Sequence, residues 1–299
     1  MDKKADIFLE YKSLLFSIAY NMLGNIDAAE DIVQDTFLKW IEVQAGTVTH
    51  TKAFLVKMVT NTCINYLHSA RVRREEYIGI WLPEPLQNYD QDKVHARMEN
   101  YHALSIGMLV LMEKLTPQER AIFLLKEIFA YDYSELADIF DKTPDSCRQI
   151  LKRAKDNLGK DTRRFEVDMK LHEKILNNFL SAIREGSVDD LIDLLKEDII
   201  LFADGGGKSF LVQGQRITAF AKPIQGRENI GRLLLTLVPK FYQSIPDFSQ
   251  RITFANGLPS ILTFSGDDPV SLVLIEPEGD RIRNIYVQTN PDKLKHFKK

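Results

Sequence analysis

The hydrophobic pattern of this chain changes near residue 168, and that change limits the folds open to it. Up to about residue 165, apolar residues recur at the spacing of helices. Beyond it come two more helical segments and then glycine-punctuated runs of β type, such as "RITFANG" and "VSLVLIEPE", with one helix at "ENIGRLLLTLVPKF". We therefore predict helical domains followed by an α+β domain.

The size of the chain allows two or three domains, each with its own core, since it has 299 residues. It has no run near the roughly 18 apolar residues of a membrane span and no signal-peptide pattern at its start. Cys63 and Cys147 lie far apart in helical segments, which favours a reducing compartment over a disulfide scaffold or zinc site. We expect a cytoplasmic protein with no membrane contact and no metal.

The net charge of −3 hides a basic segment at residues 143–167. This segment has seven Lys or Arg against four Asp or Glu, whereas residues 76–142 are acidic. A basic segment in a weakly acidic protein is typical of a nucleic-acid footprint, but a solvated helix face gives the same count. Charge alone favours the solvated face.

Helices are expected throughout the first 75 residues. After a first helix that stops at Gly24-Asn25, the spacing of Asp27 and Glu30 predicts a capping-box start for a second, "AAEDIVQDTFLKWI". Its apolar face consists of Val33, Phe37, Trp40 and Ile41. Its acidic face consists of Asp27, Glu30, Asp31, Gln34 and Asp35.

A third helix, "KAFLVKMVTNTCINYLHSARVRR", has a polar stripe along one face. The stripe consists of Lys57, Asn61, Asn65 and His68, continued by Arg71, Arg73 and Arg74. Asn and Lys aligned in this way suit contacts to the backbone and bases of DNA, although such a stripe alone is more often a solvated face.

Residues 76–103 are predicted to be a linker, because two prolines, a glycine and scattered acids interrupt any helix. Its apolar cluster consists of Tyr77, Ile80, Trp81, Leu82 and Leu86. A linker this apolar usually lies along a surface groove.

The segment "YSELADIFDKTPDSCRQILKRAKDNL" predicts a short helix, a tight turn and a second helix that is capped by Thr143 and begins at Pro144. The predicted buried stripe consists of Cys147, Ile150, Leu151, Ala154 and Leu158. The outward donors are Ser146, Arg148, Gln149, Lys152, Arg153 and Lys155. This is the geometry of a DNA-binding helix-turn-helix, in which Arg and Gln pair with base edges while Lys and Ser contact phosphates. A helical hairpin with a solvated basic face is the alternative.

These motifs, in this order over residues 5–165, resemble an extracytoplasmic-function (ECF) sigma factor of bacterial RNA polymerase. The resemblance implies two all-α domains, sigma region 2 at residues 1–75 and sigma region 4 at residues 104–165. It implies that the acidic face docks on the clamp helices of the largest subunit of core RNA polymerase, where opposite charges steer assembly.

The resemblance also assigns DNA contacts. The loop Gly46–His50 and the third helix would open and hold the −10 element through Lys57, Asn61, Asn65, Arg71 and Arg73. The helix that starts at Pro144 would read the −35 element through Ser146, Arg148, Gln149, Lys152 and Arg153. Promoter DNA is therefore an expected partner.

Three further motifs resemble those of the ECF41, or SigJ-like, subgroup, which has a fused SnoaL-like domain. They are "WLPEPL" at Trp81–Leu86, "DGGGK" at Asp204–Lys208 and "NPDKL" at Asn290–Leu294; Ile80 departs from the proline often found before the tryptophan. The resemblance implies an α+β cone of the nuclear-transport-factor-2 (NTF2) type at residues 168–299, which controls the sigma factor in cis without a separate anti-sigma protein. The expected interdomain residues are Trp81, Pro83, Pro85, Asp204, Gly205, Gly206, Gly207, Lys208, Asn290, Asp292 and Lys293.

The stretch "DGGGKS" is not expected to bind nucleotide, because a phosphate loop needs glycine where Phe202 stands. The strand-like residues "SFLV" after it predict a hairpin between two strands. Few acid–base groups follow residue 160, where the histidines are His172 and His296, so we expect no cofactor and no catalysis. The alternative is a SnoaL-type enzyme or small-molecule sensor with a DNA-binding module; a polar cavity in the cone would favour it, and an aliphatic filling would count against it.

Overall fold

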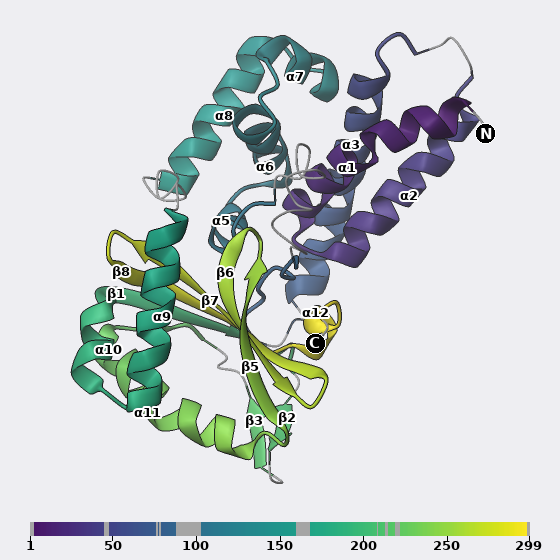
Figure 1. Ribbon diagram of the computed structural model, residues 1–299. Coiled ribbons are helices and arrows are strands. Elements are labelled where there is room, and N and C mark those ends of the chain that lie inside the picture. Colours follow the sequence, from purple (N-terminus) through teal and green to yellow (C-terminus); the bar gives the residue numbers. More distant parts are fainter. Residues whose placement is uncertain are drawn as a thin grey trace. The chain divides into compact units, whose positions relative to one another are not determined.

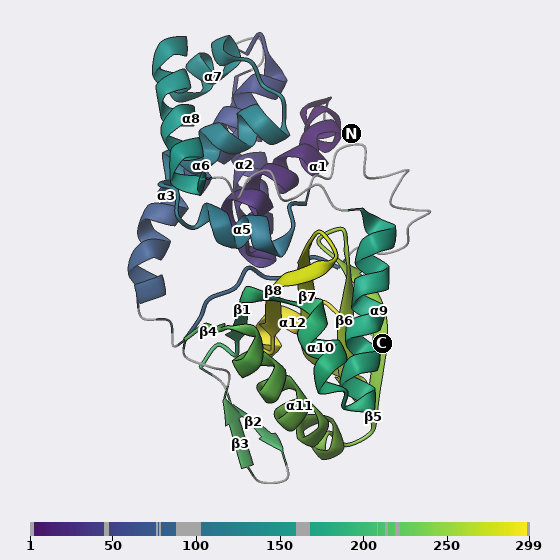
Figure 2. The same ribbon diagram turned by 90° about the vertical axis from the view of Figure 1, so that its left-hand side faces the viewer.

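The computed structural model describes residues 3–44, 48–75, 77, 79–87, 103–159, 168–207, 209–212, 215–218 and 222–297 (Figures 1 and 2). The chain divides into two compact units. The first contains Met1–Glu75, Asp90–Leu104 and Met108–Thr162, and the second contains Glu76–Tyr89, Ser105–Gly107 and Arg163–Lys299. Residues 76–89 of the predicted linker therefore cluster with the C-terminal unit.

The first unit is helical, as predicted. Its helices are α1 (Lys3–Leu23), α2 (Ile26–Glu42), α3 (Thr51–Glu75), α5 (Ile106–Met112), α6 (Pro117–Phe123), the π-helical turn η2 (Leu124–Ile128), α7 (Tyr133–Phe140) and α8 (Pro144–Leu158). The predicted start of α2 was wrong, because Asn25 is the N-cap and its Oδ1 accepts from the Ala28 amide at 2.8 Å. Asp27 lies inside the first turn, where its charge favours the helix dipole.

A buried arginine joins the parts of the first unit that come from distant sequence. The guanidinium of Arg120, on α6, donates to the Met22 carbonyl near the end of α1 at 2.8 Å and to the Met112 carbonyl at 2.7 Å. It also pairs with Glu113 at 2.8 Å. Since Arg120 is only 4% exposed, these acceptors satisfy a charge that burial would otherwise destabilise.

The helix-turn-helix follows the prediction closely. Helix α7 begins with an Asp132 capping box and ends at Asp141, whose φ of 52° starts the turn. Thr143 caps α8 and Pro144 occupies its first turn. The predicted buried stripe of α8 is confirmed in full.

The second unit is an α+β domain, which confirms the expected class. Its helices are α9 (Met169–Glu185), α10 (Val188–Leu194), α11 (Arg227–Ser244) and α12 (Pro291–Leu294). Its strands are β1 (Leu195–Asp204), β2 (Ser209–Val212), β3 (Gln215–Thr218), β4 (Ile224–Gln225), β5 (Phe248–Ala255), β6 (Leu258–Ser265), β7 (Asp268–Glu278) and β8 (Arg281–Gln288). The main sheet has the order β4-β1-β8-β7-β6-β5, and β1 runs parallel to β8.

The predicted hairpin at "DGGGKS" was wrong. Strand β2 follows the glycines, but it pairs with β3 in a separate two-stranded sheet, whereas β1 pairs with β4 and β8. The turn therefore connects two sheets. The described segment after the glycines is strand β2, whereas a phosphate loop leads into a helix.

The main sheet uses its two faces differently. Helices α9, α10 and α11 lie along one face (Figure 2), and the core between them and the sheet is aliphatic. In β1, Ile199, Leu201 and Ala203 belong to this core. Since side chains alternate along a strand, Phe202 and Asp204 lie on the opposite face, where Phe202 stacks on Tyr286 at 5.3 Å.

His172 on α9 makes the stability of the second unit depend on pH. It is fully buried, and burial lowers its pKa to about 4, although the backbone of Pro259 opposes this shift. Unfolded histidine titrates near 6.5, so protons favour the unfolded state increasingly from about pH 6.5 down to about pH 4. We expect a loss of about 3 kcal/mol over this window. Urea unfolding from pH 7 to 4 measures it, and a His172→Asn variant with the same pH slope would contradict this assignment.

Candidate functional site

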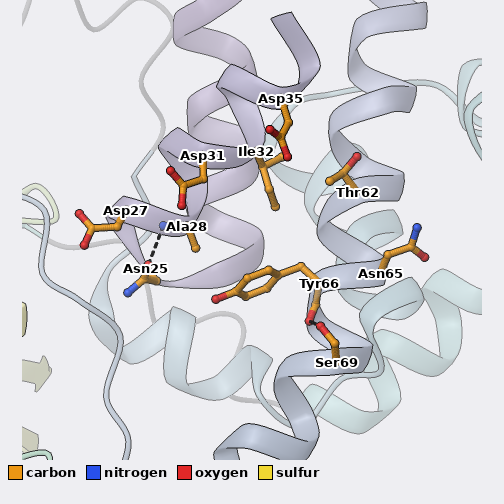
Figure 3. A pocket seen from close by; sticks show the side chains of 10 residues that line it. All are labelled: Asn25, Asp27, Ala28, Asp31, Ile32, Asp35, Thr62, Asn65, Tyr66 and Ser69. Atoms are coloured by element: carbon orange, nitrogen blue, oxygen red, sulfur yellow. Dashed lines mark hydrogen bonds between the residues drawn. The ribbon is translucent and has the colours of Figure 1, made fainter. Parts of the chain in front are cut away.

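An acidic groove of about 570 Å³ lies between α2 and α3 (Figure 3). Asp27, Asp31 and Asp35 line it from α2, because residues spaced by four share one helix face. From α3 it is lined by Thr62, Asn65, Tyr66 and Ser69. Three carboxylates on one wall suit a basic partner surface.

The groove unites parts of two predicted sets. Asp27, Asp31 and Asp35 belong to the expected polymerase-binding face, and Asn65 belongs to the expected −10 set. Glu30 and Gln34 are also exposed on α2 but do not line the groove. Leu38, 56% exposed, follows Asp35 by three residues and extends this face with an apolar side chain that the sequence analysis did not select.

Lys57 is bound within the first unit, although it belongs to the expected −10 set. Its Nζ lies 2.6 Å from Asp141 Oδ1 and donates to the Asp138 carbonyl at 3.0 Å, both at the end of α7. Asn61 and Asn65 are exposed on the same helix. The side chains of Arg71 and Arg73, and loop residues 45–47, lie outside the described residues.

The exposed face of α8 presents most of the expected −35 set. Arg148, Gln149, Lys152 and Arg153 are exposed, while Ser146 is half-buried beside the Thr143 cap. Arg148 pairs with Asp145 and lies 4.8 Å above the ring of Tyr133, which also holds Lys126 at 4.7 Å. The aromatic ring therefore orients Arg148 through cation–π contact, a role that the sequence alone did not reveal.

In the second unit, the linker is held by one buried carboxylate. Asp204 is fully buried; its Oδ1 accepts from the Tyr77 hydroxyl at 2.6 Å and the Gly206 amide at 2.9 Å. Its Oδ2 accepts from the Leu82 amide at 2.8 Å and from Lys293 Nζ at 2.7 Å. Four donors thus satisfy both oxygens of this carboxyl group away from water.

Lys293, from the "NPDKL" motif, supplies the countercharge. Besides Asp204, its ammonium donates to the Leu82 carbonyl at 2.5 Å and lies 4.6 Å from the ring of half-buried Trp81. We call Tyr77, Leu82, Asp204, Asn290 and Lys293 the linker clamp. Burial, followed by the neighbouring Asp204 carboxylate, raises the pKa of Tyr77, so its hydroxyl stays a donor.

The glycines of the turn leave room for Asn290. Gly206 has a φ of 62°, and an added Cβ would lie 2.3 Å from Asn290 Nδ2. Asn290 caps α12 through the Asp292 amide at 3.1 Å and donates to the Tyr77 hydroxyl at 3.2 Å. Gly205 is buried, Gly207 and Asp292 are exposed, and Lys208 lies outside the described residues.

The rest of "WLPEPL" packs in the same unit. Pro83 and Pro85 are buried, and buried Glu84 lies 3.3 Å from His296 Nε2. The Leu86 backbone amide donates to Asn256 Oδ1 at 2.9 Å. The Asn256 backbone amide in turn donates to the Leu86 carbonyl at 2.9 Å. His296 and Asn256 were missed because no pattern in the sequence marks them as partners of the linker.

Comparison with known proteins identifies the family. Residues 7–73 match the model "Sigma-70 region 2", and residues 107–158 match "Sigma-70, region 4". The chain is 25% identical over 289 residues to "ECF RNA polymerase sigma factor SigJ" of Mycobacterium tuberculosis, covering 94% of this chain and 89% of that protein. The chain belongs to the ECF RNA polymerase sigma factors. Region 2 thus spans α1 to α3, and region 4 spans most of α5 to α8.

The C-terminal unit distinguishes this ECF sigma factor from shorter relatives. SigW of Bacillus subtilis is 23% identical over 171 residues, covering 54% of this chain and 90% of that protein. The crystal structure of the M. tuberculosis ECF sigma factor SigJ matches 97% of this chain and 98% of its own at a TM-score of 0.74 and 22% identity, which shows a shared fold. That fold includes the α+β unit with its six-stranded mixed sheet.

No helix in the described part of the chain has the length and apolar character needed to cross a membrane. In the same part of the chain, no group of three or more His, Cys, Asp or Glu is placed to hold a metal ion.

Proposed function

We propose that this ECF sigma factor directs promoter-specific initiation through three surfaces of its helical unit. The acidic groove docks on the clamp helices of core RNA polymerase, α3 engages the −10 element through Asn61 and Asn65, and α8 reads the −35 element. The observation that carries the proposal is the row of exposed donors on α8 above a fully buried stripe. A helix-turn-helix built in this way presents its second helix to the major groove.

Arg148 and Lys152 are expected to contribute differently to DNA binding. An Arg148→Ala change should weaken promoter binding by about 1–3 kcal/mol and relax the base preference at one upstream position. Lys152→Ala should weaken binding to all sequences alike and reduce the salt slope by about 1. Binding titrations of the polymerase complex on single-base promoter variants, repeated at several salt concentrations, separate the two effects. Uniform losses from both variants would contradict base reading by Arg148.

The C-terminal unit, in this proposal, restrains the sigma factor in cis through the linker clamp. The clamp binds both the amide and the carbonyl of Leu82, so it fixes the backbone of the linker whatever its side chains do. Within the helical unit, Lys57 is engaged by the turn of the helix-turn-helix. Binding two separate promoter elements requires regions 2 and 4 to part, so a held linker favours the closed, inactive state. No separate anti-sigma protein is required by this arrangement.

The side chains packed between the main sheet and its helices give less support to the alternative, an enzyme or small-molecule sensor. The hydrophobic core between sheet and helices consists of Ile, Leu, Val, Ala and Phe side chains, and the fully buried His172 on α9 is an acid–base group in this part of the unit. A polar group lies at the β5 edge, where Gln250 Nε2 donates to the Tyr242 hydroxyl at 2.9 Å and to Thr263 Oγ1 at 3.3 Å. These donors and acceptors satisfy one another, so we propose a docking domain and not a catalyst.

A further inference from the structure

A second short stretch from the sigma part of the sequence, at the start of α5, lies within the C-terminal unit. Residues Ser105–Gly107 belong to the C-terminal unit, whereas the helix continues from Met108 in the helical unit. Gly107 is buried, and a Cβ built on it would lie 2.7 Å from Glu276 Oε2 and 3.1 Å from the Tyr286 hydroxyl. A side chain at this position would therefore fit only if Glu276 or Tyr286 moved.

The side chains beneath Gly107 form a fixed seat. Glu276 Oε2 accepts from Asn284 Nδ2 at 2.8 Å and from the Tyr286 hydroxyl at 2.7 Å. Tyr286 is 3% exposed and stacks on Phe202. A free glutamate could swing away from an added methyl group, but one held by two hydrogen bonds would have to break them.

We propose that Glu276, Asn284 and Tyr286 form a docking seat for the first turn of region 4, with Gly107 as the residue that fits it. The seat lies on the same sheet face as Asp204, since Phe202 and Asp204 alternate with the core residues of β1. The C-terminal unit thus binds two parts of the connection between regions 2 and 4: residues 77–87 near its start and residues 105–107 at its end. This deepens the proposed cis restraint and rests on it for its biological role, but the seat itself is testable without polymerase.

Hydrogen exchange of the full-length chain, followed in peptides that cover residues 103–112, tests the seat. Gly107→Ala should speed exchange there about tenfold or more, as overpacking of a tight contact predicts. Gly231→Ala is the matched control, because Gly231 is also a buried helical glycine but its added Cβ would meet Ile192 at an ordinary 3.4 Å. Exchange in residues 133–158 should stay unchanged in both variants, which checks that region 4 remains folded.

A second substitution at Glu276, added to Gly107→Ala, shows whether the size or the charge of the Glu276 side chain causes the faster exchange. Adding Glu276→Ser to Gly107→Ala should restore slow exchange because it makes room, whereas adding Glu276→Gln should not, because its size is the same. Wild-type exchange in Gly107→Ala, or equally fast exchange in both double variants, would overturn the seat. These outcomes are independent of transcription: a chain with an intact seat that failed to bind core polymerase would refute the proposed function and leave the seat standing.

Discussion

Replacing Asp204 by alanine is expected to destabilise the C-terminal unit by about 3–5 kcal/mol, the usual result of leaving one charge of a buried pair alone. Lys293 has 8% of its side chain exposed, and its ammonium would lose the carboxylate with which it pairs. The Leu82 amide would lose its acceptor as well. Urea unfolding measures the stability, and hydrogen exchange at Leu82 measures release of the linker.

The double variant Asp204→Asn, Lys293→Met is the control for this prediction. It removes both charges while keeping similar volumes, and neutral replacements of buried pairs often cost little. We expect it to be clearly more stable than Asp204→Ala and to retain part of the protection at Leu82. Equal destabilisation of the single and double variants would show that the ion pair does not hold the linker clamp together. In reconstituted transcription, release of the linker should raise output relative to the intact chain.

Reversing the charge of the acidic groove is expected to have the largest effect on assembly. Changing Asp27, Asp31 and Asp35 to lysine turns attraction to a basic surface into repulsion. Because like charges across an interface cost several kcal/mol, affinity for core RNA polymerase should fall about a hundredfold or more. Fluorescence titration of labelled sigma factor with core polymerase measures the loss, which should be largest at low salt.

A matched variant reverses three exposed acids of the C-terminal unit, Glu173, Glu185 and Asp189. It changes the net charge by the same amount but leaves the groove intact. Its affinity should stay close to that of the unchanged chain. If both variants lose affinity equally, net charge and not the groove would govern assembly.

Local patterns predicted the helical unit well because its elements depend on nearby residues. The stripe of α8, its Thr143 cap and Pro144 follow from spacing within a dozen positions. The start of α2 failed because Asn25 and Asp27 are both good caps, and backbone geometry chose between them. The hairpin at "DGGGKS" failed for a different reason: strand pairing is settled by partners far along the chain, such as β8 for β1.

The linker clamp also depends on contacts between residues far apart in the chain, which local sequence patterns do not predict. All three motifs were singled out from sequence, but nothing local indicates that Asp204 pairs with Lys293, 89 residues away. The seat at Gly107 was not foreseen at all, since a buried helical glycine carries no chemical signal. Its meaning appears only when Glu276 and Tyr286 are found beside it.

The most direct test of the central claim is transcription in vitro by the cognate core polymerase with this chain on fragmented genomic DNA, with every transcript start sequenced. We expect transcript starts that depend on the chain and share a two-part upstream motif. Arg148→Ala should alter only the −35 half of that motif, and Asn61→Ala with Asn65→Ala only the −10 half. Starts that match those of core polymerase alone, or a chain that does not associate with core polymerase, would contradict it.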